Sequence, residues 1–214
     1  MDTKPDYNRL YNIVEEQGGY FTAAQARGMG FSWERLSNNV KSGKFQRVAS
    51  GVYRLVQFPA NAHEDLMVAW LVAGPHSTIS HESALAFHEL SDVLPAEVHV
   101  IVPRTASRRR ANIRQHTHQL APDEVTRRDG LRVTTVARTI ADVASHGLAE
   151  EQVHQAIQEA LQRGLVSQED LLTQAERRGG RAKKIILSTI QKEVEPPDEM
   201  GKRIQADGKR CGHG

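Results

Sequence analysis

The residues best suited to chemistry lie in the first quarter of the chain, and their side chains are those that read DNA bases. In the major groove, arginine can bind guanine and asparagine can bind adenine through two hydrogen bonds at once. Lysine, arginine and glutamine also contact phosphates. The 214-residue chain gathers such side chains near its start, and we expect DNA contacts from Thr22, Gln25, Ser32, Arg35, Ser37, Asn38, Asn39, Lys41, Lys44, Gln46 and Arg47.

Three short helices and a hairpin would position these side chains. Thr22 begins the second helix with a capping box, and Ser32 can cap the third. Alternating stretches on either side of Ala49-Ser50-Gly51 predict a β-hairpin. The pattern predicts a winged helix-turn-helix domain over residues 1–57, with the third helix in the major groove. We expect Trp33 to be a packing residue in the core or at its rim. A protein-docking domain with a solvated polar face remains the alternative.

Ten histidines raise the question of a metal site. His81 and His88 are seven residues apart and would share one helix face, and His116 and His118 would alternate along one strand. The His-Glu-x-x-His spacing of zinc enzymes is missing. From spacing alone we expect these histidines to be surface or half-buried residues, with no metal and no cofactor.

Other arrangements that could suggest catalysis have structural interpretations. Ser80-His81-Glu82 places three catalytic residue types in a row, but adjacent helical positions do not face one another. Ser80 is therefore expected to cap a helix. Arg138 and Asp142 can pair along a helix, and if they are buried they would fix that helix on the sheet. The sequence contains no glycine-rich phosphate loop or dinucleotide fingerprint. We expect no enzymatic activity.

Basic residues return between two predicted strands. Residues 101–140 carry nine arginines and three acidic residues, whereas residues 61–100 carry six acidic residues and no lysine or arginine. Like charges held close together cost free energy unless a polyanion relieves them. A solvated loop is the alternative to a nucleic-acid contact. The five arginines of this loop are Arg104, Arg108, Arg109, Arg110 and Arg114.

The rest of the chain predicts a second, mixed domain over residues 61–178. Strands are expected at 97–103, 112–118 and 131–134, with helices packed on the sheet. Residues 179–214 are expected to form a helical extension and a disordered tail. The fold class is therefore α+β, a winged helix-turn-helix followed by a small β-sheet packed by helices. The single cysteine and the lack of a long apolar run predict a soluble cytoplasmic protein without a disulfide framework.

Four short motifs follow one another at residues 19–26, 47–54, 80–85 and 133–142. In this order they resemble those of AbiEi-like antitoxins, the transcriptional-regulator half of type IV toxin–antitoxin systems. The resemblance covers roughly residues 5–175. It implies a winged helix that binds inverted repeats in its own promoter, and a C-terminal domain that opposes a nucleotidyltransferase-type toxin without a stable complex. The arginine loop is the candidate antitoxin surface.

Two functions remain open at this point. The first is a DNA-binding repressor and antitoxin, bound as two copies to promoter DNA with inverted repeats. The second is a winged-helix protein-interaction module whose C-terminal domain processes nucleic acid. A neighbouring nucleotidyltransferase gene would favour the first, and metal-dependent cleavage of DNA or RNA would favour the second.

Overall fold

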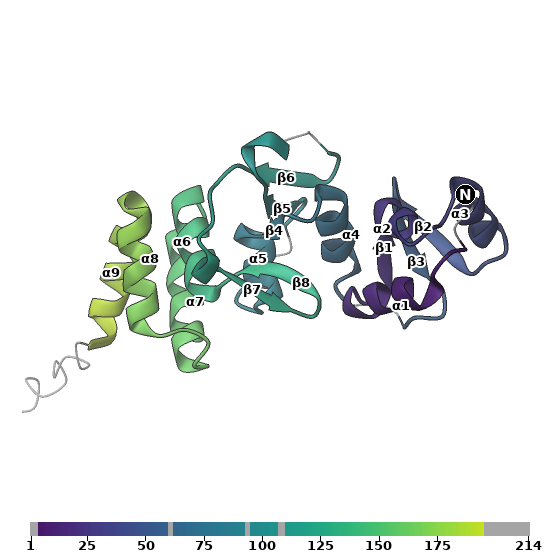
Figure 1. Ribbon diagram of the computed structural model, residues 1–214. Coiled ribbons are helices and arrows are strands. Elements are labelled where there is room, and N and C mark those ends of the chain that lie inside the picture. The colour runs from purple at the N-terminus through teal and green to yellow at the C-terminus, as the bar shows by residue number, and fades with distance from the viewer. Residues whose placement is uncertain (1–3, 60–61, 93–94, 107–109, 195–214) are drawn as a thin grey trace, which may run out of the picture.

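The computed structural model describes residues 4–59, 62–92, 95–106 and 110–194, and the chain runs from a winged helix at one end to a helical layer at the other (Figure 1). A mixed β-sheet lies between these two parts. The predicted α+β fold class is confirmed. Among the described residues, no helix is both long and apolar enough to cross a membrane.

The N-terminal part has the predicted three helices and hairpin, with one additional short strand. The capping box at Thr22 is confirmed, and Ser32 caps the third helix as predicted. The three strands form an antiparallel sheet in the order β1-β3-β2. Its elements are α1 (Tyr7–Glu16), β1 (Tyr20–Thr22), α2 (Ala23–Gly28), α3 (Trp33–Lys41), β2 (Phe45–Ala49) and β3 (Val52–Leu55).

Aromatic packing holds the winged helix together. The rings of Phe21 and Phe45 meet edge to face at 5.0 Å between centroids, and Phe21 stacks on Tyr53 at 5.7 Å. Leu36 places α3 against the same core, in which it is fully buried. Burial of such side chains is the main favourable term for a small domain. This core therefore fixes which face of α3 is turned outward.

The middle of the chain forms a five-stranded sheet in the order β6-β5-β4-β8-β7. Strand β4 is antiparallel to β5 and parallel to β8, and β5 is parallel to β6. The predicted strands are present, and β7 is an additional one. The elements are α4 (Glu64–Ala73), β4 (Thr78–Ile79), α5 (His81–Phe87), β5 (Val98–Ile101), η1 (Arg104–Ala106), β6 (Ile113–His116), η2 (Pro122–Glu124), β7 (Val125–Arg128) and β8 (Leu131–Thr134).

Four helices complete the described chain: α6 (Val136–His146), α7 (Glu150–Gln162), α8 (Gln168–Arg178) and α9 (Gly180–Val194). Ile140, Ile157, Leu171 and Ile186 are fully buried and belong to one apolar core. The helical layer therefore continues beyond residue 178 through α9. The expected disordered tail falls almost wholly on residues 195–214, which lie outside the described residues.

The winged helix packs directly on the mixed sheet. Tyr20 and Val52 share a core with Met67 of α4. Gly130, in the turn between β7 and β8, has φ +77°, and a Cβ atom there would overlap the main-chain oxygen of Glu16 at the end of α1. Only glycine fits such an approach without strain. The two parts are thus joined by apolar contact and by close main-chain packing.

Candidate nucleic-acid interface

Helix α3 presents a polar face to solvent. Ser32, Arg35, Ser37, Asn38 and Lys41 are exposed, whereas Leu36 on the opposite face is buried. The Ser32 hydroxyl accepts a hydrogen bond from the main-chain N–H of Arg35 at 3.2 Å, which fixes the start of the helix. Because this contact uses only the main chain of Arg35, its guanidinium is available to a ligand. The exposed face of α3 therefore carries side chains of the types that contact base edges.

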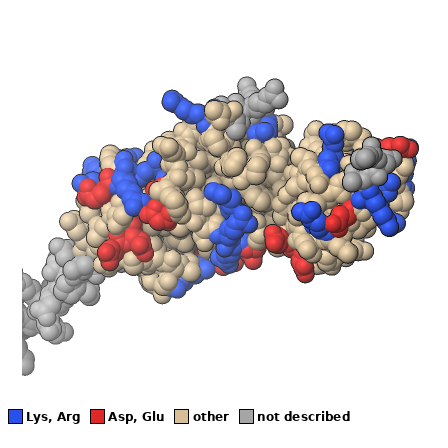
Figure 2. Space-filling model, in the orientation of Figure 1, with Lys and Arg blue, Asp and Glu red and all other residues tan. Residues whose placement is uncertain are grey.

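The hairpin beside α3 adds basic and polar side chains. Lys44, Gln46 and Arg47 are exposed, and the last two lie on β2 directly opposite Arg54 and Tyr53 of β3. Figure 2 shows lysine and arginine side chains at this end of the molecule. The hairpin thus occupies the position of a wing, where it can contact DNA phosphates.

Three other predicted DNA contacts form bonds within the domain. Thr22 and Gln25 bond each other in the capping box, and the Gln25 amide nitrogen also donates to the side-chain oxygen of Gln17 at 2.8 Å. Asn39 is only 6% exposed, and its amide donates to the main-chain oxygen of Arg35 at 2.8 Å. It shares a helix face with Leu36, so it does not reach the outer surface of α3.

Trp33 differs from the expectation of a packing residue in the core or at its rim. Its side chain is 56% exposed at the first position of α3. It lies one turn before Leu36, beyond the end of the apolar core. The guanidinium of Arg27 in α2 lies 5.2 Å from the centre of its ring, a cation–π distance. Arg27 and Trp33 thus form an additional exposed pair beside the predicted contacts.

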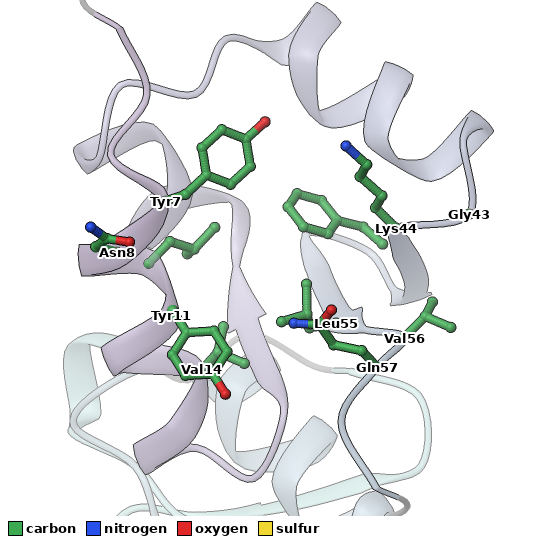
Figure 3. A pocket seen from close by; sticks show the side chains of 11 residues that line it. Tyr7, Asn8, Tyr11, Val14, Gly43, Lys44, Leu55, Val56 and Gln57 are labelled. Atoms are coloured by element: carbon green, nitrogen blue, oxygen red, sulfur yellow. The ribbon is translucent and has the colours of Figure 1, made fainter.

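A groove of about 570 Å³ lies on another side of the winged helix (Figure 3). Tyr7 and Tyr11 of α1 line one wall, and Lys44 and Leu55 line the other. Its lining is mainly aromatic and aliphatic, which distinguishes it from the polar face of α3. Lys44 lines the groove and is also a candidate wing contact, so the groove borders the candidate DNA surface.

The described residues of the arginine loop lie at the β6 edge of the mixed sheet. Arg104 in η1 and Arg114 in β6 are exposed, and Arg110 is half-buried just before β6. Arg108 and Arg109 lie outside the described residues. The structure therefore places three of the five predicted arginines along one sheet edge.

A second basic surface lies at the other edge of this sheet. Arg127 of β7 is paired directly with Arg132 of β8, and Arg128 is exposed beside them. Like charges placed opposite each other on a sheet are unfavourable. Figure 2 shows lysine and arginine side chains over this hairpin. The sequence pattern did not predict this surface, because β7 lacks the alternation of apolar and polar residues that indicates a strand. The excess of arginine in residues 101–140 was the one sign of it.

The predicted pair of Arg138 and Asp142 is part of a larger buried ionic network. Arg138 Nε donates to the Asp142 carboxylate at 2.9 Å, and Arg138 Nη1 donates to Glu124 Oε2 at 2.6 Å. Arg178 of α8 also pairs with Asp142. Burial alone would raise the pKa of Glu124, but the Ala121 N–H and Arg138 outweigh it and lower that pKa. The network joins η2, α6 and α8, which makes it structural.

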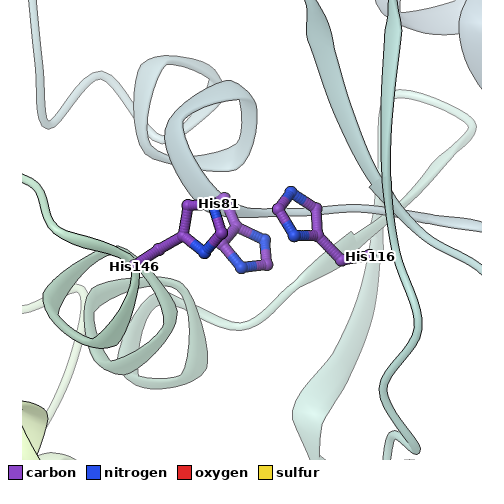
Figure 4. A group of neighbouring side chains, drawn as sticks. All are labelled: His81, His116 and His146. Carbon is purple, nitrogen blue, oxygen red and sulfur yellow. The ribbon is translucent and has the colours of Figure 1, made fainter.

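Histidines distant in sequence meet between the sheet and α6 (Figure 4). His81, His116 and His146 each place a ring nitrogen within 4.8 Å of the others. Their spacing in sequence gave no sign of this cluster, because three separate elements supply them. His81, His88 and His116 are buried, so the expectation that they are surface or half-buried residues was wrong. His88 Nε2 contacts the main-chain oxygen of Thr134 at 2.9 Å.

Ser80 and His81 also depart from the expected helical geometry. His81 has φ +51°, which brings its Nδ1 within 3.0 Å of the Ser80 hydroxyl. The expectation that the Ser80 and His81 side chains do not face each other was wrong. Ser80 precedes the helix, and the backbone of His81 has a left-handed conformation. Ser80 occupies the N-cap position as predicted, but its side chain makes no capping hydrogen bond.

Comparison with known proteins gives a family match, which lies in the N-terminal part of the chain. Residues 8–56 match the family described as transcriptional regulator, AbiEi antitoxin. The match includes α2, α3 and the wing, which carry the candidate DNA contacts. The sequence matches no curated protein.

Proposed function

Because residues 8–56 match the family described as transcriptional regulator, AbiEi antitoxin, we propose that this chain represses its own promoter and acts as the antitoxin of a type IV toxin–antitoxin system. It acts by binding, without a catalytic step, and in the cytoplasm. The observation that carries the proposal is the exposed polar N-terminal half of α3 beside a basic wing. The mixed sheet and helical layer form the part that opposes a nucleotidyltransferase-type toxin.

The exposed face of α3 supports sequence-specific contact. Arg35 and Asn38 are three residues apart and therefore lie on the same side of the helix. Their side chains can reach the edges of neighbouring base pairs when the helix enters the major groove. Ser32, Ser37 and Lys41 extend the same polar surface. Thr22, Gln25 and Asn39 act in this proposal by holding α2 and α3 in place.

The exposed wing supports phosphate contact. Replacing Arg47 with alanine should weaken binding to every DNA sequence by a similar factor. If Arg47 neutralises one phosphate, the slope of log K against log salt should fall in magnitude by about 0.9. Fluorescence anisotropy of labelled promoter DNA over a salt series measures this slope. Lys192→Ala, at an exposed position in α9, is the matched control and should leave it unchanged. An unaltered slope in Arg47→Ala would remove Arg47 from the interface.

The antitoxin part of the proposal is supported by the basic β6 edge. Reversing two charges with Arg104→Glu and Arg114→Glu should reduce rescue of growth in cells that express the nucleotidyltransferase-type toxin that this proposal pairs with the chain. A polyanionic partner would be repelled by the reversed charges. The double variant Lys184→Glu, Lys192→Glu, at two exposed positions of α9, makes the same change in net charge and should rescue growth normally. Full rescue by the double variant would exclude this edge as the antitoxin surface.

Co-expression with that nucleotidyltransferase also tests the function as a whole. The wild-type chain should restore growth and should lower expression of a reporter placed behind its own promoter. The toxin should not co-purify with it as a stable complex. Failure of both activities would contradict the proposal, and metal-dependent cleavage of DNA or RNA by the pure chain would replace it with a nuclease function.

A further inference from the structure

Four imidazole rings gather around that of His81, between α5, the sheet and α6. The ring of His81 stacks on that of His116 at 3.7 Å between centroids. The His146 ring meets the His81 ring edge to face at 5.1 Å between centroids. The ring centroids of His99 and His118 lie 5.9 Å and 6.4 Å from that of His81. The cluster contains half of the ten histidines in the chain. Its members come from four separate segments, so only the fold brings them together.

Three of these rings have the geometry of an incomplete metal site. The nitrogens of His81, His116 and His146 lie within 4.8 Å of one another (Figure 4). Zinc–nitrogen bonds of about 2.0–2.1 Å in a tetrahedral site place ligand nitrogens about 3.3 Å apart. The rings must therefore approach by at most about 1.5 Å. His146 can supply this movement, because it is exposed at the last position of α6.

The environment keeps the buried rings in the form that binds metals. Burial and the neighbouring histidines lower the pKa of His81 far below its ordinary value. Burial, His99 and His146 lower the pKa of His116 to about 3. Both rings are therefore neutral near pH 7, and a neutral imidazole offers a lone pair to a metal ion. A bound cation would relieve the unfavourable approach of several lone pairs.

Surrounding polar groups orient the rings. The Ser80 hydroxyl lies 3.0 Å from His81 Nδ1, which leaves His81 Nε2 available. His116 Nε2 lies 3.4 Å from His99 Nδ1, and Glu82 Oε2 in turn lies 2.7 Å from that His99 nitrogen. His116 Nδ1 is thereby left available. Metal-binding histidines are typically held in this way through their second nitrogen. His81 also adopts a left-handed backbone conformation, which is uncommon for residues other than glycine and often marks a functional site.

We propose that His81, His116 and His146 bind a divalent first-row transition metal ion, with Zn²⁺ as the best fit to three imidazole ligands. The exposed side of His146 leaves the fourth position to water. The ion would connect α5, strand β6 and α6, and so tie the sheet edge that carries Arg114 to the helical layer. The metal is a structural link in this arrangement and takes no part in DNA contact by α3.

Zinc titration of the chelator-treated full chain, produced without a histidine tag, tests the proposal. Isothermal titration calorimetry should show one equivalent of Zn²⁺, and the midpoint of thermal unfolding should rise with added Zn²⁺. His146→Gln should weaken binding at least about tenfold and abolish the rise in midpoint. This variant changes an exposed side chain, so circular dichroism should show an unchanged fold.

Two controls separate this site from other histidines. His154→Gln removes a partly exposed histidine that lies 3.4 Å from Glu150, and it should bind zinc as the wild type does. The double variant Cys211→Ser, His213→Gln changes the tail, which lies outside the described residues, and should also bind normally. Cobalt substitution gives an independent signal, because tetrahedral nitrogen-ligated Co²⁺ absorbs visible light. Equal zinc affinity in His146→Gln and wild type, loss of binding in the tail variant, or no binding at all would each overturn the proposal.

Discussion

Replacing Arg138 with methionine should destabilise the protein by about 3–5 kcal/mol, the cost typical of removing one partner from a buried charge network. Asp142 is fully buried and Glu124 is 4% exposed, so both carboxylates would lose a partner that cannot be replaced by water. Methionine keeps much of the volume of the side chain and therefore isolates the loss of charge. Urea unfolding followed by circular dichroism measures the change.

The matched control for this variant is Arg163→Met. Arg163 also forms two ion pairs, with Glu89 at 3.2 Å and Glu159 at 3.0 Å, but all three side chains are exposed to solvent. Exposed pairs contribute little, so the loss should be several-fold smaller. Equal losses in the two variants would show that the Arg138 network is not a buried structural link.

Arg35→Ala and Asn38→Ala should each weaken binding to the promoter by about 10- to 100-fold, which corresponds to a lost bidentate base contact of about 1–3 kcal/mol. The loss of affinity should be confined to promoter DNA. The affinity of Asn38→Ala for scrambled DNA should therefore change little. Competition of labelled promoter DNA with scrambled DNA measures both quantities.

Control variants for α3 come from another exposed helix of the same domain. Arg9→Ala and Asn12→Ala change the same residue types in α1 and should leave promoter affinity unchanged. Neither Arg35 nor Asn38 contributes its side chain to the domain core. Loss of affinity for promoter and scrambled DNA alike in Asn38→Ala would mean that α3 contacts the backbone and does not read bases.

The helices and most strands could be predicted because their signals are local. The Thr22 capping box, the Ser32 cap and the glycines that follow most of the helices act within a few residues. Strands β1 and β7 were missed for a physical reason. Strand β1 has only three residues, and three of the four residues of β7 are exposed, so neither shows alternation of buried and exposed positions.

Side-chain roles were harder to predict, because they depend on which face the core covers. Residue type placed Asn39 among the base contacts, although its spacing from Leu36 points to the buried face. Trp33 shows the reverse case, since a large aromatic residue lies outside the core. The Arg138 and Asp142 pair was visible as a spacing of four, but Glu124 and Arg178 come from other elements.

The histidine cluster shows the limit of motif spacing. Known zinc motifs place two ligands on one helix or one turn. Here α5, β6 and α6 each supply one histidine, so no pair has a diagnostic spacing. The left-handed backbone of His81 was equally invisible, because most residues other than glycine avoid that conformation.

Binding of the full chain to its own promoter is the most direct test of the central claim that this protein is a DNA-binding autorepressor. Labelled promoter DNA is titrated with protein at several salt concentrations, with scrambled DNA as competitor. We predict saturable binding that survives the competitor, with two copies on the inverted repeats. Weak binding without sequence preference that disappears at moderate salt would contradict the claim and would indicate that the winged helix docks another partner.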